Sequence, residues 1–293
     1  MSTPKSALDW IHYAHHALEG ADIFYGHGTD NPWDEACALI LDALDLAHDV
    51  SDQVLNQPLS TDSQQLLAVL LDKRIQHHIP TPYLTHKAWF CGMPFYIDER
   101  ALIPRSPLAE WIDTGGEPWL EPDRVMRVLD LCTGSGCIAI ACAYAYPNAV
   151  VDAVDLSADA LAVACQNVDM HDMQDRVHLY EGDLFSPVVG QQYDLIISNP
   201  PYVPYEEMQE LPAEYLQEPD MALRAGEDGL FIVDQILKTA KTYLKPAGVL
   251  VVEVGNTWQI MDERYPSLPF TWLEFEQGGD GVFLLTRANL YTQ

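Results

Sequence analysis

One apolar run of the sequence ends in a tetrapeptide whose groups suit chemistry on a planar nitrogen. Asn199-Pro200-Pro201-Tyr202 follows the run from Tyr193 to Ser198 directly. The lone pair of an amide or aromatic amine is delocalised, so reaction there requires positioning. The Asn199 side-chain carbonyl and the Pro200 backbone carbonyl can each accept one N–H of an NH2 group and stabilise the positive charge that develops. Alone, the tetrapeptide is more typical of a rigid loop. Together with the sites described next it predicts catalysis, with Tyr202 packing on the substrate plane.

A second chemical feature is a glycine-rich turn. Gly134-Ser135-Gly136 follows the apolar run that ends at Leu131 and precedes a helical pattern. Glycine lets the backbone approach a ligand closely, and the start of a helix offers free N–H donors. The residues from Gly134 to Ala139 also match the G-x-G-x-x-G/A pattern of dinucleotide enzymes, so a nicotinamide oxidoreductase stays open beside a turn that binds nothing.

Acidic residues near the ends of three apolar runs favour a nucleoside ligand. Asp155 lies about 20 residues after the glycines, where a carboxylate can accept from both hydroxyls of a ribose. Asp130 precedes the glycines and suits an ammonium group. Asp183 can accept from an exocyclic adenine amine, with Leu184 or Phe185 covering the ring. Each of these is common alone, and their succession predicts a binding site.

A parallel sheet is the element that would bring these residues together. Apolar runs alternate with helical segments after Gly116, and they span Val125 to Leu131, Val150 to Asp155, Val177 to Tyr180, Tyr193 to Ser198 and Val249 to Val254. That alternation predicts an α/β fold with crossover helices. Phe270 to Phe275 and Val282 to Thr286 flank a turn from Gln277 to Gly281, which predicts a terminal hairpin and an antiparallel edge.

The first part of the chain predicts helices. Asn31 and Pro32 supply a cap and a first-turn proline for a helix ending near Leu46. A second helix follows Thr61 and stops before Pro80. We therefore expect a helical domain over residues 1–84, a hairpin or linker over 85–124 and the α/β domain over 125–293.

The charge of the chain restricts its partners. Its 44 acidic and 15 basic residues give a formal net charge of -29, which would repel free nucleic acid. The acidity either keeps the surface solvated or attracts a basic protein. The same two interpretations apply to a group of acids after the tetrapeptide, namely Glu206, Glu207, Glu210, Glu214, Glu218 and Asp220.

Composition predicts a cytoplasmic protein without a metal. No stretch reaches the roughly 20 apolar residues of a membrane span, and the start of the chain lacks the apolar core of a secretory signal. The cysteines show no spacing for zinc or disulfides. The adjacent histidines, His15, His16, His77 and His78, have no further ligand spacing, so surface histidines are the favoured interpretation.

With these motifs in register, the chain resembles the class I methyltransferases and, among them, the HemK/PrmB protein-glutamine methyltransferases. The likeness covers almost the whole chain and includes the Ile103-Pro104-Arg105 connector and the turn from Gly278 to Gly281. It implies a Rossmann-like, mostly parallel seven-stranded sheet with an antiparallel terminal strand, preceded by a small helical domain. The cofactor implied is S-adenosylmethionine, leaving as S-adenosylhomocysteine, with no metal.

Two branches of that family differ in substrate. The segments from Phe24 to Trp33 and from Lys87 to Gly92 resemble the branch that modifies the third protein of the large ribosomal subunit. Ser106-Pro107 departs from the release-factor branch. The implied reaction is methylation of a glutamine amide in that basic ribosomal protein, free or in an assembling ribosome. A release-factor enzyme, an adenine-directed nucleic-acid methyltransferase and a non-catalytic assembly factor are the alternatives.

The resemblance and the residue types together assign the site. The expected cofactor contacts are Asp130, Thr133, Gly134, Ser135, Gly136, Asp155, Asp183, Leu184, Phe185 and Asn199. The expected substrate contacts are Asn199, Pro200, Pro201, Tyr202, Phe95 and Arg105, of which Asn199, Pro200 and Tyr202 are catalytic. Hairpin packing is the alternative role of Phe95, and an ion pair that of Arg105. Substrate recognition is expected from the helical domain.

Overall fold

The computed structural model describes residues 4–276 and 278–290, so Gln277 of the predicted hairpin turn lies outside the described residues. Its first part is helical, and the helices are α1 (Ala7–Glu19), α2 (Pro32–Ala43), α3 (Asp52–Leu55), α4 (Thr61–His77) and α5 (Thr81–Thr85). The Asn31 side chain caps α2 by accepting from the backbone N–H groups of Trp33 and Asp34. This helix ends at Ala43, before the predicted Leu46, and Asp45 then takes a positive φ.

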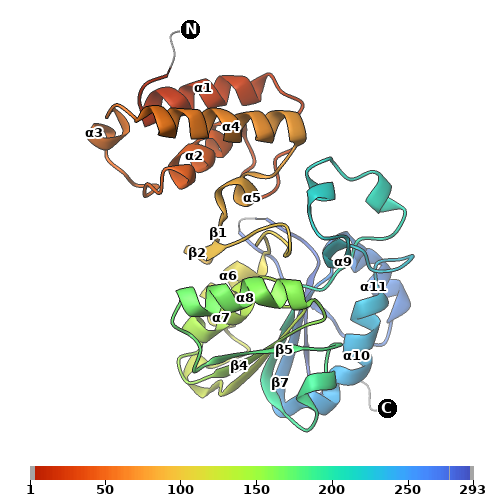
Figure 1. The fold of residues 1–293 in the computed structure, drawn as a ribbon. Coiled ribbons are helices and arrows are strands. Elements are labelled where there is room, and N and C mark those ends of the chain that lie inside the picture. Colours follow the sequence, from red (N-terminus) through yellow and green to blue (C-terminus); the bar gives the residue numbers. More distant parts are fainter. Residues whose placement is uncertain (1–3, 277, 291–293) are drawn as a thin grey trace.

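A short hairpin connects the helices to the rest of the chain. It pairs β1 (Lys87–Phe90) with β2 (Met93–Tyr96) in antiparallel register. The connector continues through α6 (Leu108–Asp113) and the 3-10 helix η1 (Pro122–Arg124). Figure 1 shows the helical part on one side of this hairpin and the large sheet on the other.

The large sheet has seven strands in the order β5-β4-β3-β6-β7-β9-β8. They are β3 (Arg127–Leu131), β4 (Val150–Asp155), β5 (Val177–Glu181), β6 (Tyr193–Ser198), β7 (Leu244–Glu253), β8 (Thr271–Trp272) and β9 (Val282–Thr286). The pairs from β5 to β7 are parallel, and β9 is antiparallel to both β7 and β8. The predicted mostly parallel sheet with an antiparallel terminal strand is confirmed, although β8 is shorter and β7 begins earlier than the apolar runs indicated.

Helices cover both faces of this sheet. One face carries α7 (Cys137–Ala145) and α8 (Ala158–Met170), and the other carries α10 (Phe231–Tyr243) and α11 (Trp258–Arg264). Successive strand residues point to opposite faces of the sheet. Val128 packs in the core on the α7 side, and Leu129 packs in the core on the α10 side. The remaining helices are short, namely η2 (Ser186–Val188), η3 (Glu207–Gln209), η4 (Tyr215–Gln217), α9 (Asp220–Leu223) and η5 (Gly255–Thr257).

The strand order creates a place for a ligand. Chain order runs outward from β3 to β5 on one side and from β6 to β7 on the other, so the direction reverses between β3 and β6. Crevices at such a reversal, outside the carboxyl ends of the strands, are where open α/β sheets bind ligands. Within the described ranges, every helix is too short or too polar to cross a membrane.

Candidate active site

The glycine turn between β3 and α7 depends on residues with positive φ. Cys132, Gly134 and Gly136 have φ of 59°, 55° and 79°, a region that glycine enters without steric cost. A Cβ at Gly136 would lie 3.2 Å from the Cβ of Ala164 on α8, whereas one at Gly134 would meet no atom within 4 Å. Gly136 thus lets the turn pack on α8, and Gly134 has an open side that a ligand can approach.

Asp155, at the end of β4, faces the same turn. Its Oδ2 accepts from the backbone N–H of Gly134 at 2.8 Å, and its Oδ1 accepts from that of Ser157 at 2.9 Å. Burial raises the pKa of this carboxyl, while hydrogen bonds from backbone N–H groups act in the opposite direction. Each carboxylate oxygen still has a free lone pair, so the group is fixed in place and able to accept from hydroxyls of a ligand.

A cavity of about 270 Å³, called the first cavity, lies over these strand ends. Of the predicted cofactor residues, those that line it are Gly134, Asp155, Asp183, Leu184 and Asn199. The sequence analysis missed other parts of its wall, which include Leu102, Leu156, Met221, Ala222, Phe231 and Ile232. Except for Leu156, which follows Asp155, these residues come from segments that carry no motif.

The structure does not bring the other predicted cofactor residues to the first cavity. Asp130 is fully buried, where its Oδ2 accepts from the Thr133 hydroxyl and its Oδ1 has no hydrogen-bond partner among the described residues. The buried Ser135 accepts through its backbone carbonyl from Asn167 at 2.8 Å. Phe185 packs in the core, with its ring 4.6 Å from that of Tyr243. These residues support the turn and the floor of the site.

The tetrapeptide after β6 stands between the first cavity and a second one. This second cavity has a volume of about 230 Å³. Asn199 lines both cavities, Pro200 and Tyr202 line the second, and Pro201 lines the first. A group bound in the second cavity can therefore meet a group bound in the first at Asn199.

Tyr202 is held by a buried carboxyl. Its hydroxyl donates to Glu253 Oε1 at 2.9 Å, and the Ser106 hydroxyl donates to Glu253 Oε2. Burial raises the pKa of the Glu253 carboxyl to about 7, against the hydrogen bonds from Ser106 and Tyr202 and the charge of Arg105. A Cβ at Gly255 would lie 2.6 Å from the Tyr202 ring, so glycine there admits the ring. Glu253 was not predicted from the sequence. Its position at the end of an apolar strand, like that of Asp155, was the signal that could have identified it.

Arg105 borders the second cavity and also forms a buried ion pair. Its two terminal nitrogens donate to the two carboxylate oxygens of Glu218 at 2.5 and 2.6 Å. Burial raises the pKa of Glu218, but the hydrogen bond from His27 and the charge of Arg105 outweigh it and leave the pKa below its usual value. Phe95 reaches neither cavity, because it is 1% exposed and packs against His171 on the hairpin side.

A closed loop over residues 203–226, called the 203–226 loop, completes the second cavity. Backbone hydrogen bonds join its ends, from Val203 N to Leu223 O at 2.9 Å and from Tyr205 N to Gly226 O at 2.9 Å. The steering role considered for its acids is wrong for Glu214 and Glu218, which are 2% and 6% exposed and paired with Arg74 and Arg105. The acids of this group that remain exposed are Glu206, Glu207, Glu210 and Asp220.

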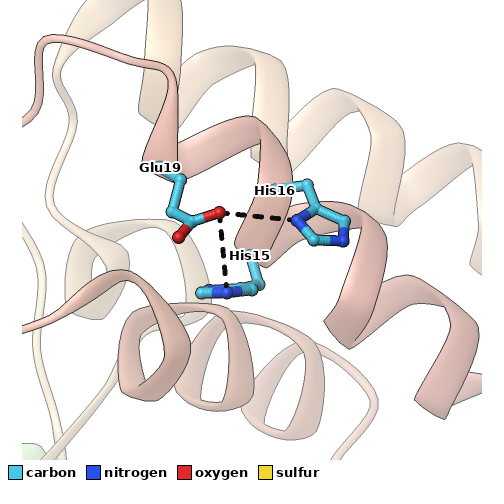
Figure 2. Close-up of side chains that lie close together, drawn as sticks. All are labelled: His15, His16 and Glu19. Carbon is cyan, nitrogen blue, oxygen red and sulfur yellow. Dashed lines mark hydrogen bonds and ion pairs between the residues drawn. The ribbon is translucent and has the colours of Figure 1, made fainter.

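The histidines considered for metal binding lie on two helices. His77 ends α4, and His78 caps that helix and lies 3.2 Å from Glu214 Oε1, whereas His15 and His16 lie on α1. Figure 2 shows Glu19 between His15 and His16, with its Oε2 at 3.8 Å from His15 Nε2 and 3.5 Å from His16 Nδ1. His16 and Glu19 are more than half exposed, and all three side chains have their potential ligand atoms within 4.8 Å of one another. The arrangement is that of a helix-surface ion pair.

Comparisons with known proteins agree with this geometry. Residues 112–226 match the family model described as the methyltransferase small domain. A curated protein of Francisella tularensis named ribosomal protein uL3 glutamine methyltransferase is 45% identical over 96% of this chain and 90% of its own length. A protein of the same name from Neisseria meningitidis is 48% identical over 96% of this chain and 93% of its own. The catalytic domain of human METTL16 shares the fold, with a TM-score of 0.51 at 16% identity over 78% of this chain and 81% of its own.

Proposed function

This chain belongs to the ribosomal protein uL3 glutamine methyltransferase family, and we propose that it methylates the side-chain amide nitrogen of a glutamine in uL3, the third large-subunit protein. The methyl donor of this family of enzymes is S-adenosylmethionine. The observation that carries the proposal is the position of Asn199, which lines both cavities together with Leu102 and Ala222 and is the residue of the tetrapeptide that does so.

The residues of the first cavity fit the cofactor. Gly134 leaves open space where any other residue would place a Cβ, and the fixed carboxylate of Asp155 suits the hydroxyls of a ribose. Asp183 and Leu184 supply an acceptor and an apolar surface for an adenine. Asp130 lies behind the turn. Its Oδ2 accepts from the Thr133 hydroxyl and fixes that residue, while its Oδ1 has no partner among the described residues.

The second cavity would hold the glutamine amide. When bound, S-adenosylmethionine supplies an electrophilic methyl group. The Asn199 side-chain carbonyl and the Pro200 carbonyl accept the two amide N–H groups, so the nitrogen lone pair points toward the first cavity. Tyr202, fixed by Glu253, packs against the amide plane.

The same two acceptors stabilise the reaction as charge develops. Transfer of the methyl group would make the amide nitrogen cationic, and the two preorganised carbonyl oxygens of Asn199 and Pro200 would favour that charge. The cationic nitrogen is acidic, so it releases its proton to water without a general base. The products are N5-methylglutamine and S-adenosylhomocysteine, and the chemistry requires no metal.

The charge of the chain suits this partner. Its formal net charge of -29 would attract a basic ribosomal protein and repel free nucleic acid, whether uL3 is free or part of an assembling ribosome. The reaction takes place in the cytoplasm, where ribosomal proteins are made.

Mass spectrometry tests this proposal. Purified large-subunit proteins are incubated with the enzyme and S-adenosylmethionine, and each product is weighed and fragmented. A single added methyl on a glutamine amide of uL3 supports the proposal. Modification of release factors instead would assign the chain to the other branch, and the absence of transfer would favour a non-catalytic assembly factor.

A further inference from the structure

Tyr215 occupies a wall of the second cavity at the junction of three parts of the chain. It begins η4 in the 203–226 loop and lines the cavity together with Pro200 and Tyr202. The Arg105 guanidinium lies 5.1 Å from the centre of its ring, a distance at which a cation and an aromatic face attract. The ring is half-buried. Its contacts therefore fix its position while one side remains available to a substrate.

The helical domain supplies the other ring contacts of Tyr215. The ring of His27 lies 4.7 Å from it and the ring of Phe24 lies 5.6 Å away. Between these residues, Gly26 makes room, because a Cβ there would lie 2.7 Å from Phe24 Cε1 and 3.2 Å from the Tyr215 oxygen. The segment from Phe24 to His27 is thus shaped around this tyrosine.

Two buried acids near Tyr215 connect the loop to other parts of the protein. Glu214 accepts from Arg74 of α4 at 3.0 Å and from the backbone N–H of Phe24 at 3.1 Å. Glu218 pairs with Arg105 of the connector and lies 3.4 Å from His27 Nε2. Because each acid is buried and paired, moving the loop away would leave charges without partners. Figure 1 shows the loop, in teal, reaching toward the helical domain.

We propose that Tyr215 is a substrate-positioning residue through which the segment from Phe24 to His27 selects the protein substrate. This inference rests on the proposed function. The cavity that Tyr215 lines also has an apolar part, formed by Val203, Pro204 and Leu211, and the exposed Glu207 lines it as well. The matching substrate is a peptide segment with small or apolar residues beside the glutamine and a basic residue close by. Tyr215 packs on that segment and leaves the amide to Asn199 and Pro200.

Steady-state kinetics on purified uL3 test this role. Tyr215→Ala should raise KM for uL3 at least about tenfold, as removal of a central aromatic contact does in other interfaces, with kcat changed much less. The Kd for S-adenosylmethionine should stay unchanged, because Tyr215 does not line the first cavity. Leu216→Ala is the matched control, since Leu216 neighbours it on the same loop but is 63% exposed and not part of the wall.

A double-mutant cycle tests the connection to the helical domain. Phe24→Ala should also raise KM for uL3. The Phe24→Ala/Tyr215→Ala double variant should have a KM little higher than that of Tyr215→Ala alone, because both substitutions remove the same ring contact. Additive effects would overturn the coupling, and an unchanged KM in Tyr215→Ala would overturn the inference. Tyr215→Phe keeps the ring contacts and should retain the wild-type KM, which guards against a folding defect in the alanine variant. If the wild-type enzyme leaves uL3 unmodified, the proposed function itself fails.

Discussion

The two cavities that meet at Asn199 are built in different ways. The first cavity is formed at strand ends, and the contact that fixes it joins Asp155 to Gly134 across 21 residues. The second depends on contacts between distant segments, such as those that join Arg105 to Glu218 across 113 residues and Tyr202 to Glu253 across 51. The parallel sheet supplies the first cavity directly, whereas the second exists only after the connector, the 203–226 loop and the helical domain have come together.

Each cavity also has a buried carboxyl of altered acidity behind it. Burial raises the pKa of Asp130 behind the glycine turn to about 7, and it raises that of Glu253 behind Tyr202 to about the same value. Asp130 accepts from a residue of its own turn, and Glu253 accepts from residues of two other segments. We therefore expect substitutions that alter a buried charge to destabilise the second cavity, whose partners come from separate segments, more than the first.

The largest effect is expected from the ion pair under the 203–226 loop. Glu218→Gln keeps the shape of the side chain but leaves the Arg105 charge without its partner, which should lower the free energy of unfolding by about 3 kcal/mol. Urea denaturation measures this difference. Glu210→Gln, at an exposed position of the same loop, should change the free energy of unfolding by less than about 0.5 kcal/mol. Equal values for the two variants would show that the loop is not held by this pair.

The tetrapeptide residue that lines both cavities has the next largest expected effect. Asn199→Ala removes one of the two proposed acceptors, and losing one such preorganised group lowers kcat by about 10²–10³-fold in other enzymes. Binding of S-adenosylmethionine, measured by calorimetry, should weaken only a few-fold, because the rest of the first cavity remains.

Asn256→Ala provides the comparison for this variant. Asn256 carries the same side chain and lines the second cavity but not the first. Its removal should reduce kcat less than about tenfold. If the Asn199→Ala enzyme keeps the wild-type kcat, the Asn199 side chain does not take part in the reaction.

The unequal construction explains what the sequence could predict. The glycine turn, Asp155, Asp183 and the tetrapeptide each lie at the end of a run of apolar residues, so the strand pattern predicts that they share one edge of the sheet. Phe185 was assigned to the site as a ring that could cover an adenine, and Phe95 by the family resemblance, but both rings are buried in the cores. Local pattern does not determine which side of a loop faces a cavity.

The second cavity was predicted only in its tetrapeptide and Arg105. Tyr215 and Glu253 have no local signal that identifies their partners, because those partners come from the helical domain and the connector. The acids of the 203–226 loop show the same limit. Exposed and buried glutamates look alike in the sequence, and only the presence of Arg74 and Arg105 nearby distinguishes Glu214 and Glu218.

The carboxyl behind Tyr202 predicts a pH dependence. The folded pKa of Glu253, about 7, lies above the usual glutamate value of 4.5. Its contribution to stability is therefore complete below pH 4.5 and is lost as pH rises through about 7. Gln cannot ionise. The unfolding free energy of Glu253→Gln minus that of wild type should therefore increase by about 3 kcal/mol between pH 5 and pH 8.

Urea titrations at the two pH values measure this change. Glu263→Gln, at an exposed position of α11, should differ from wild type by less than about 0.5 kcal/mol at both. A difference for Glu253→Gln that stays constant with pH would mean that the buried carboxyl is already ionised at pH 5.

The smallest effect is expected in the first cavity. There, substitution of Gly136 should affect packing, and substitution of Gly134 should affect ligand binding. An alanine at either position takes a positive φ, which lowers the free energy of unfolding by about 1–2 kcal/mol. At Gly136 the added methyl also presses on Ala164, so its stability loss should be the larger of the two. At Gly134 the added methyl enters open space, so it should weaken cofactor binding instead. The Kd for S-adenosylmethionine should rise about tenfold, which corresponds to about 1.4 kcal/mol of binding free energy. Calorimetry and urea denaturation on both variants measure the two quantities. If Gly134→Ala binds the cofactor as wild type does, the open side of the turn does not face the ligand, and the first cavity must hold it by Asp155 and Asp183 alone.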